Sequence, residues 1–345
     1  MPTRDSKRAS RPVTIVDVAR EAGVSPATAS RAFNGSARTV RDANLQRVLA
    51  AAAKLSYAPN ASAQAVVRGD TSTVALLISD ITDPYFSWIA AGVIEAAENA
   101  GLQVTVAVTN RNADRELDLV RYFRAQRPRA IIIGGSRAGS DERSRDLVNE
   151  LTAFERSGGK AVTVSQGELG FRSVNLNDRK GAAELARRLV HLGYQSFGII
   201  AGPLEPGVAS ERVAGFEEGL ASVGLQVDPD AVVRSAFSWE GGYDAARVFP
   251  QEVIDGLDLI FAVNDMMALG AIAGLRLRGL SVPADIALAG YDDIAPLRDT
   301  SPSLTTVRIP LKDVGAASVL LGLDDDERVA MIEPLVVIRD STPRR

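Results

Sequence analysis

The sequence contains no cysteine and a single histidine, His191. The absence of cysteine excludes disulfides, thiolate zinc sites and cysteine nucleophiles, and one histidine leaves few options for metal sites or Ser-His-Asp catalysis. Long apolar runs are also missing, since none approaches the roughly 18 residues of a membrane-spanning helix. The N-terminal segment is basic but lacks the apolar run of a signal peptide. We therefore expect a cytoplasmic protein with no membrane partner, no metal and no cofactor.

Positive charge is scarce outside the N-terminal end. The chain has 345 residues and a net charge of −4, and its first 70 residues hold eleven Lys and Arg against five Asp and Glu. That segment is therefore +6, and the remainder is −10. A basic head on an acidic body is typical of a DNA-binding module joined to another domain, although a solvated basic tail would give the same count. The length favours two or three structural units.

Residues 14–34 have the pattern of two short helices joined by a tight turn. Thr14 and Asp17 have the spacing of a capping box, and Gly23 is suited to a helix end. Ser25 can cap the second helix, with Pro26 at its first position. This is the layout of a helix-turn-helix, whose second helix lies in the DNA major groove. Ala29, Ala32 and Phe33 are expected to face inward, and the side chains left facing outward are Ala27, Thr28, Ser30, Arg31 and Asn34.

Two further segments complete the expected head. Residues 39–57 predict a third helix with an apolar face of Leu45, Val48, Leu49, Ala52 and Leu55, which closes a domain at residues 1–57. Residues 58–70 predict a hinge helix that Pro59 and Asn60 begin. With fewer than ten residues it is shorter than the roughly 12–15 needed for stability alone, so it requires a partner. A plain linker is the alternative for this segment.

From residue 73 onward, β-branched runs alternate with amphipathic helical stretches. The runs cover residues 74–79, 104–109, 130–135, 161–165, 197–202, 259–263 and 286–291. Such alternation predicts parallel sheets covered by helices on both faces. About 270 residues exceed one such sheet, so we expect two lobes, the second beginning near residue 172.

Polar residues follow several of these runs. In open α/β sheets, ligands bind beyond the carboxyl ends of the strands, so two lobes facing each other predict a cleft for a small polar molecule. Each residue taken singly could instead cap a helix or form a turn. The residues in question are Asp80, Ser136, Gly202, Pro203, Arg212, Asn264, Asp265, Tyr291 and Asp292.

The chain resembles the LacI/GalR family of bacterial transcription regulators. The resemblance rests on TIVDVAREAGVSPATASRAFN, YAPNASAQAVV, GPLEPGVASERVAGFEEGL, NDMMALGAI and GYDDIAP, which occur in order over nearly the whole chain. It implies a helix-turn-helix head at 1–57, a hinge helix at 58–70 and a two-lobed α/β core at 71–345 that is like periplasmic binding proteins. Lobe 1 would span about 71–171 and 308–332, and lobe 2 about 172–307 and 333–345. It also implies a homodimer and a small effector.

The resemblance assigns the expected DNA contacts. Pro26, Ala27 and Arg31 match base-reading positions, and Arg31 can make a bidentate contact to guanine, although it could also be a solvated helix charge. Val66 matches a hinge residue that is inserted into the minor groove, where the family usually has leucine. The full set of expected DNA contacts is Thr14, Ser25, Pro26, Ala27, Thr28, Ser30, Arg31, Asn34, Tyr57, Asn60, Ala63 and Val66.

The resemblance also assigns an effector site. Arg212 and Asp292 match effector-binding positions, and Phe237 matches an aromatic residue that packs on the ligand, with Trp239 close by; core packing is the alternative for both rings. Asn177-Asp178 stands where the family usually has Asp-Asn, so that contact is expected to be rearranged. The expected effector residues are Asp80, Tyr85, Phe86, Ser136, Arg212, Phe237, Trp239, Asn264 and Asp292.

We interpret the sequence as that of a DNA-binding regulator that acts as a repressor on a pseudo-palindromic operator and is controlled by a sugar or sugar derivative. A purine or nucleoside effector is the first alternative, and a sugar-carrying binding protein is the second. An enzyme using Asp80, Asp265 and Asp292 for acid–base chemistry is the third. No nucleophile–base set, phosphate-binding loop or metal cluster supports an enzyme, so no catalytic residue is expected. A regulator would be associated with the nucleoid.

Overall fold

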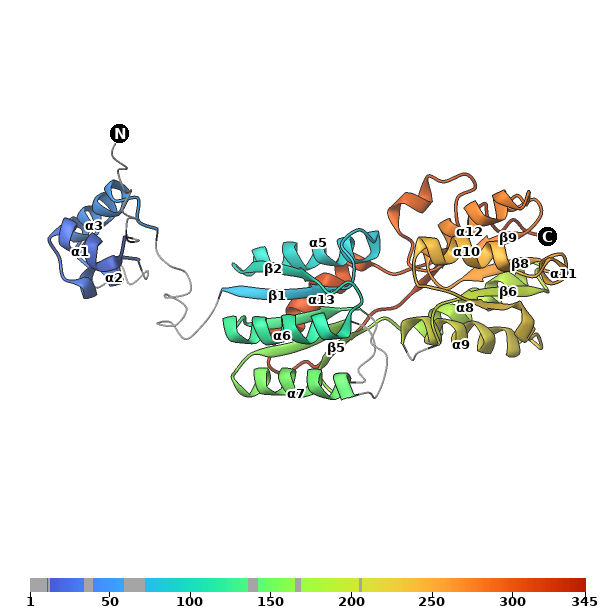
Figure 1. Ribbon diagram of the computed structural model, residues 1–345, viewed down its shortest axis with the longest axis horizontal. Coiled ribbons are helices and arrows are strands. Elements are labelled where there is room, and N and C mark those ends of the chain that lie inside the picture. The colour runs from blue at the N-terminus through green and yellow to red at the C-terminus, as the bar shows by residue number, and fades with distance from the viewer. Residues whose placement is uncertain are drawn as a thin grey trace, which may run out of the picture. The chain divides into compact units, whose positions relative to one another are not determined.

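The computed structural model describes residues 11, 13–33, 40–58, 72–135, 142–164, 169–204 and 207–345 (Figure 1). The chain divides into two compact units, Met1–Thr71 and Ser72–Arg345, which we call the head and the body. In neither unit do the described residues form a helix with the length and apolar character required to cross a membrane.

The described residues of the head form three helices, α1 Ile15–Ala22, α2 Pro26–Phe33 and α3 Asp42–Lys54. The predicted capping box is present at α1, where the Asp17 carboxylate accepts hydrogen bonds from the Thr14 backbone N–H (3.0 Å) and hydroxyl (2.6 Å). Gly23 ends α1 in the left-handed conformation, at φ 62°, which costs glycine little because it has no Cβ. The helix-turn-helix is therefore built as the sequence predicts.

One small apolar core holds the three head helices together. Val18 of α1, Ala29 of α2 and Val48 of α3 are completely buried in it. The prediction that Leu49 faces the core is wrong, since Leu49 is 43% exposed and Ala51 is buried instead. The buried face of α3 is that of Val48, Ala51 and Ala52, and at about 100° per residue Leu49 lies outside it.

The first sheet of the body has six strands, all parallel, in the order β11-β5-β4-β3-β1-β2. Its strands are β1 Thr73–Ile78, β2 Gln103–Val108, β3 Ala130–Gly134, β4 Lys160–Val164, β5 Arg172–Asn175 and β11 Val329–Met331. Helices cover both faces, and these are α5 Pro84–Asn99, α6 Ala113–Gln126, α7 Glu142–Arg156 and α13 Leu311–Leu323 (Figure 1).

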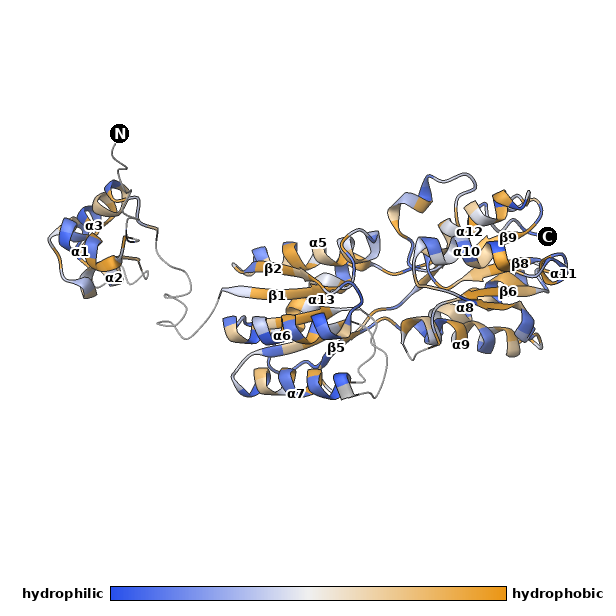
Figure 2. Ribbon diagram, viewed as in Figure 1, coloured by the Kyte–Doolittle hydropathy of each residue, from blue (hydrophilic) through white to orange (hydrophobic). Residues whose placement is uncertain are grey.

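Side-chain alternation along the strands explains why helices are needed on both faces. Leu76 of β1 lies in one apolar cluster with Ile89 of α5, whereas the next residue, Leu77, lies in another with Phe123 of α6 and Leu151 of α7. Successive side chains of a strand point to opposite faces, so an apolar run must be covered twice. Figure 2 shows the corresponding hydrophobic strands between helices that are partly hydrophilic.

The second sheet has four parallel strands in the order β7-β6-β8-β9. They are β6 Phe197–Ala201, β7 Val232–Arg234, β8 Leu259–Ala262 and β9 Ala287–Ala289. Two helix pairs flank this sheet, α8 Asp178–His191 with α9 Val208–Ala221, and α10 Trp239–Val248 with α12 Asp265–Leu277 (Figure 1). Three short helical turns complete it: η2 Pro229–Ala231, α11 Gln251–Ile254 and η3 Ala295–Arg298.

The chain passes between the two sheets at three places. The first crossing follows β5, because β5 pairs with β4; the lobe boundary therefore comes after Asn175 and not near residue 172. The second leads from β10 Thr306–Arg308 into α13, and the third from β11 into β12 Leu335–Val337. Strands β10 and β12 pair antiparallel as a small separate sheet. The expected α/β architecture with parallel sheets is confirmed, and the seven expected strands are all present.

Five strands of the described residues lie outside those seven runs, namely β5, β7, β10, β11 and β12. Each has only three or four residues, too few to show an alternation of apolar and polar positions. Helix α5 starts at Pro84 because Asp83 caps it by accepting a hydrogen bond from the Tyr85 N–H (3.0 Å). Tyr85 and Phe86, two of the expected effector residues, therefore lie in the first turn of this helix.

Candidate functional sites

The second head helix, α2, presents most of the residues expected to contact DNA. Pro26, Ala27 and Arg31 are exposed, and Thr28 and Ser30 are half-buried. Ser25 caps α2, since its hydroxyl oxygen accepts a hydrogen bond from the Thr28 N–H (3.1 Å) and lies 2.8 Å from the Thr28 hydroxyl. The exposed side chains of α2 are therefore two small apolar ones, Pro26 and Ala27, and one arginine near the end of the helix.

The other expected DNA contacts divide into two groups. Thr14 is half-buried and bonded to Asp17, and Tyr57 packs into the head core with its ring 5.7 Å from that of Phe33. Both residues thus have a structural role in the head. The remaining four, Asn34, Asn60, Ala63 and Val66, lie outside the described residues, as does most of the expected hinge helix.

In the body, Arg212 of α9 is the centre of a buried polar cluster. It is 1% exposed, and its guanidinium donates from Nε to Asp178 Oδ1 (2.8 Å), from Nη2 to Asp292 Oδ1 (2.8 Å) and from Nη1 to the Val263 carbonyl (2.9 Å). Its Cζ lies 3.9 Å from the centre of the Tyr291 ring. The partners come from the start of α8 and from the residues after β8 and β9, so the carboxyl ends of the strands converge here as expected.

The sequence pattern missed Asp178, which is the second carboxylate on Arg212. Asn177 adopts a left-handed conformation at φ 50°, and the following Asp178 begins α8 with a buried side chain. The reversed order Asn177-Asp178 was a visible signal, because it places the acid where the usual order has an amide. The rearranged contact that we expected is thus an ion pair with Arg212.

The Arg212 cluster is strongly desolvated. Burial raises the pKa of Asp292 to about 7, although the neighbouring Arg212 acts in the opposite direction. The backbone of Asp292 has φ 115°, an angle that is unfavourable for a residue with a Cβ. A hydrogen bond from the Asp292 N–H to the Val307 carbonyl (2.8 Å) holds this conformation. Burial likewise raises the pKa of Tyr85, with the charge of Asp292 as the next cause. Tyr85 belongs to α5, so a first-lobe residue faces the second-lobe charges.

Aromatic side chains from the two lobes meet at Arg111, which the sequence pattern also missed. The Arg111 Cζ lies 5.8 Å from the centre of the Phe86 ring and 5.5 Å from that of Phe237, and its Nη2 is 3.9 Å from Asp83 Oδ2. Phe86 packs edge-on against Tyr85 at 5.0 Å. Arg111 follows β2, a strand whose carboxyl end our sequence argument did not consider. Its left-handed backbone, φ 56°, is a feature that only the structure reveals.

Three expected effector residues have other contacts. Asp80 accepts hydrogen bonds from the Thr82 N–H (2.8 Å) and hydroxyl (2.7 Å), and the Asn264 side-chain oxygen caps α12 by accepting from the Met267 N–H (2.7 Å). Trp239 is 36% exposed and stacks on Tyr243, with ring centres 5.4 Å apart. The contacts of Asp80 and Asn264 are those of a turn former and a helix cap, the alternatives that the sequence left open. Trp239 packs at the surface, so core packing, the alternative considered for it, is wrong. Ser136 lies outside the described residues.

Acid–base and metal chemistry find little support in the described part of the chain. Asp265 is fully buried, and its carboxylate accepts from the Ile294 N–H (2.9 Å) and the Thr306 hydroxyl (2.8 Å). It is therefore occupied in holding the chain and is not directed at a ligand. Across the described residues, no group of three or more His, Asp and Glu side chains is arranged as metal ligands would be.

Comparisons with known proteins match both units. Residues 14–60 match the family described as bacterial regulatory proteins, lacI family, and residues 186–342 match the periplasmic binding protein-like domain. Among curated proteins, the HTH-type transcriptional repressor CytR of Escherichia coli (strain K12) is 30% identical over 325 residues, which cover 92% of this chain and 91% of that protein.

Solved structures show the same similarity. The crystal structure of the Lac repressor dimer bound to operator and the anti-inducer ONPF is similar with a TM-score of 0.81 and 27% identity, covering 96% of this chain and all of that one. The complex of the transcriptional regulator CelR with cellobiose has a TM-score of 0.69 and 27% identity, again covering 96% and 100% of the two chains.

Proposed function

The chain belongs to the lacI family of bacterial regulatory proteins, and from this premise we propose that a small polar effector bound at Arg212 and Asp292 controls its affinity for operator DNA. The observation that carries the proposal is the buried cluster in which Arg212 meets Asp178 and Asp292 at the carboxyl ends of the second sheet. The charge of Asp292 also helps to raise the pKa of Tyr85, a residue of the first lobe. A ligand in contact with both lobes can favour one lobe arrangement over another, which is the requirement for allosteric control.

On the DNA side, we propose that α2 enters the major groove and that Arg31 reads a guanine. Pro26 and Ala27 are exposed beside it and can offer apolar contact to a thymine methyl group. A head of this size has few such contacts, so we propose that two copies bind the two halves of a pseudo-palindromic operator as a homodimer. The similar Lac repressor structure is that of a dimer on an operator. The same proposal assigns the protein to the cytoplasm, at the nucleoid.

The effector that the site suits best is a sugar or sugar derivative. Carboxylate and guanidinium groups pair with hydroxyls, and the half-buried Phe237 ring can offer a face to the C–H groups of a sugar ring if Arg111 moves aside. The similar regulator CelR is in complex with cellobiose. A nucleoside is a second candidate, because a flat cationic group, the guanidinium of Arg111, already lies against both aromatic rings. A base could take the same place by stacking.

We propose no enzymatic activity. The carboxylates that could have formed an acid–base pair are engaged elsewhere, Asp80 in its own turn and Asp265 with Thr306 and Ile294. The Arg212 cluster pairs its carboxylates with a permanent cation, which suits binding better than proton transfer.

Thermal unfolding with a panel of sugars and nucleosides tests the effector site. A compound bound in the cleft raises Tm by mass action. Phe237→Ala should reduce that rise in Tm because it removes one aromatic face, while Tyr122→Ala, which alters an exposed ring on α6, should preserve it. An undiminished rise in the Phe237 variant would place the ligand elsewhere.

Selection of genomic duplexes followed by fluorescence anisotropy tests the DNA site. Arg31→Ala should weaken binding to the selected duplex by about 1–3 kcal/mol, and the effector should change the affinity of the parent protein. Arg187→Ala, an exposed arginine of α8 paired with Glu184, is the matched control and should leave DNA binding unchanged. A parent protein that binds selected and random duplexes equally at physiological salt contradicts the proposal.

A further inference from the structure

A pocket lies where the chain crosses between the lobes. This crossover pocket has a volume of about 240 Å³ and shares no lining residue with the Arg212 cluster. Trp88 of α5 and Lys312 of α13 line it from helices of the first sheet, and Arg298 of η3 and Arg308 of β10 line it from the segment that follows the second sheet. The pocket therefore joins the two lobes at a place different from the proposed effector site.

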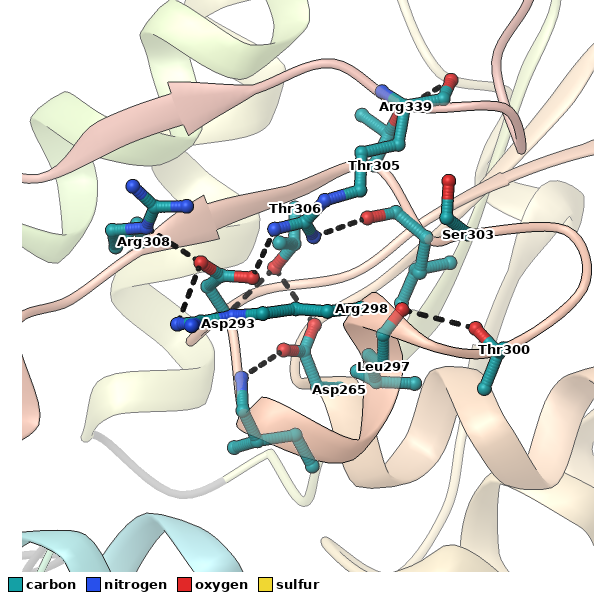
Figure 3. Close-up of polar contacts among 12 residues, drawn as sticks. Asp265, Asp293, Leu297, Arg298, Thr300, Ser303, Thr305, Thr306, Arg308 and Arg339 are labelled. Atoms are coloured by element: carbon teal, nitrogen blue, oxygen red, sulfur yellow. Dashed lines mark hydrogen bonds and ion pairs between the residues drawn. The ribbon is translucent and has the colours of Figure 1, made fainter.

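The floor of the crossover pocket is a buried carboxylate, Asp293, whose side chain has no exposed surface. Arg308 donates to it from Nε (2.6 Å), Arg339 from Nη2 (2.6 Å) and Arg298 from Nη2 (3.4 Å) (Figure 3). The Thr306 hydroxyl accepts from the Asp293 N–H (3.3 Å) and donates to Asp265 (2.8 Å), which ties the floor to α12. These contacts fix the arginines in place before any ligand arrives.

The pocket has more positive charge than its acids can balance. Its lining holds three cations and two acids, namely Arg298, Arg308, Lys312, Asp293 and Asp313. Arg339, outside the lining, is a third arginine on Asp293, and Lys312 also lies 3.6 Å from a carboxylate oxygen of Glu95. Four cations therefore face three carboxylates. Arg298 and Arg308 remain 52% and 41% exposed, so they are anchored by Asp293 and still reach the pocket. Arginines held in this way pair with phosphate oxygens with little loss of side-chain freedom.

We propose that the crossover pocket binds the phosphate group of a small metabolite. The phosphate would contact Arg298, Arg308 and Lys312, and the Trp88 indole would lie beside the organic part. A volume of about 240 Å³ suits a small ligand and not a dinucleotide or a protein segment. Because the contacts come from both sides of a crossing, the bound phosphate would favour the lobe arrangement that keeps these cations together.

Trp88 provides a local signal for a test on the full-length protein. The chain has two tryptophans, Trp88 and Trp239, so Trp239→Phe leaves one indole, at the edge of the pocket. The Lys312 Nζ lies 5.5 Å from the centre of the Trp88 ring, so an anion that draws this ammonium group away should change the fluorescence. Inorganic phosphate is titrated against chloride at constant ionic strength, without DNA or cleft effector, and we expect a saturable change with phosphate alone.

In the same background, Arg298→Gln combined with Lys312→Gln should weaken phosphate binding by about tenfold or more, since each charge-assisted hydrogen bond contributes more than 1 kcal/mol. Arg308 is kept because it holds Asp293. Arg187→Gln is the matched control and should bind phosphate as the parent does, and circular dichroism verifies that each variant is folded.

Two outcomes overturn the proposal. One is an equal phosphate affinity in the pocket variant and in the control, and the other is a fluorescence response to phosphate no larger than the response to chloride. Phosphate bound to the basic head would give the first outcome, because these substitutions do not change the head. Because neither DNA nor effector is present, the outcome is independent of the proposed function.

Discussion

At the scale of single residues, the effector site depends on one buried guanidinium. A buried charge is costly unless it is paired, and Arg212 is paired with two carboxylates and one carbonyl oxygen. Two of these four groups, Arg212 and Asp292, were evident from the sequence because they follow strand ends or match the family pattern. Asp178 was missed, since its pairing depends on a left-handed turn at Asn177.

The buried carboxylate leads to a pH prediction. The pKa of Asp292 is raised from 3.8 to about 7, so the folded protein holds this proton more tightly than the unfolded chain does. The contribution of Asp292 to the free energy of unfolding should therefore decrease as pH rises from about 4 to about 7. Asp292→Asn removes that titration, and urea denaturation between pH 5 and 8 should show a flatter pH dependence than in the parent.

The control for this experiment is Asp118→Asn, a carboxylate on α6 that is 77% exposed and should leave the pH dependence of the parent unchanged. If the Asp292 and Asp118 variants show the same pH dependence as the parent, the carboxyl of Asp292 does not titrate in this range and the description of a desolvated cluster is wrong.

At the scale of elements, the close approach of α10 and α12 positions the second-lobe side of the site. A Cβ added to Gly270 of α12 would lie 1.9 Å from the Trp239 carbonyl oxygen, and one added to Gly242 of α10 would lie 2.0 Å from the Met267 carbonyl oxygen. Each helix therefore needs a glycine where the backbone of the other passes. Phe237 lies just before α10, so the separation of the two helices also affects the aromatic face of the proposed effector site.

Gly270→Ala should consequently force the two helices apart. We expect the free energy of unfolding to fall by about 1–3 kcal/mol, the usual cost of overpacking a tight contact. Gly256→Ala is the control, because its nearest neighbour, the Val253 carbonyl oxygen, is 3.5 Å from the added Cβ. Urea denaturation measures both variants, and equal stability would show that the α10–α12 contact tolerates a methyl group.

At the scale of the whole molecule, the chain consists of a basic DNA-reading head and a larger acidic body that has its own core. The body, Ser72–Arg345, contains both sheets, the Arg212 cluster and the crossover pocket. The apolar core of the head is formed by described residues of the head itself. Ligand binding should thus be a property of the body, and sequence-specific DNA binding a property that requires the head.

A fragment of residues 72–345 should keep the rise in Tm given by the effector and lose the ability to distinguish the selected duplex from a random one. Both properties can be measured on the same preparation, by thermal unfolding and by fluorescence anisotropy. A fragment that is folded but no longer responds to the effector would show that the site needs residues outside the body.

The sequence by itself determined the helix-turn-helix, the parallel α/β body and the family. These depend on local signals, namely the capping box at Thr14 and Asp17, the glycine at the turn, and apolar runs long enough to show a period. Arg31 and Arg212 could be proposed in advance as contacts to DNA and to the effector, because a strong motif surrounds each of them.

The tertiary structure alone decided which polar residues meet. Asp80, Asn264 and Asp265 stand after strands as binding residues would, yet local hydrogen bonds to Thr82, Met267 and Thr306 occupy them. Arg111 and Asp293 also stand after strands, but nothing in the sequence pattern singled them out. Each becomes a meeting point because residues distant in the chain fold around it. Hydrogen bonds and ion pairs act over a few ångströms of space, whereas a sequence pattern reports only on neighbours along the chain.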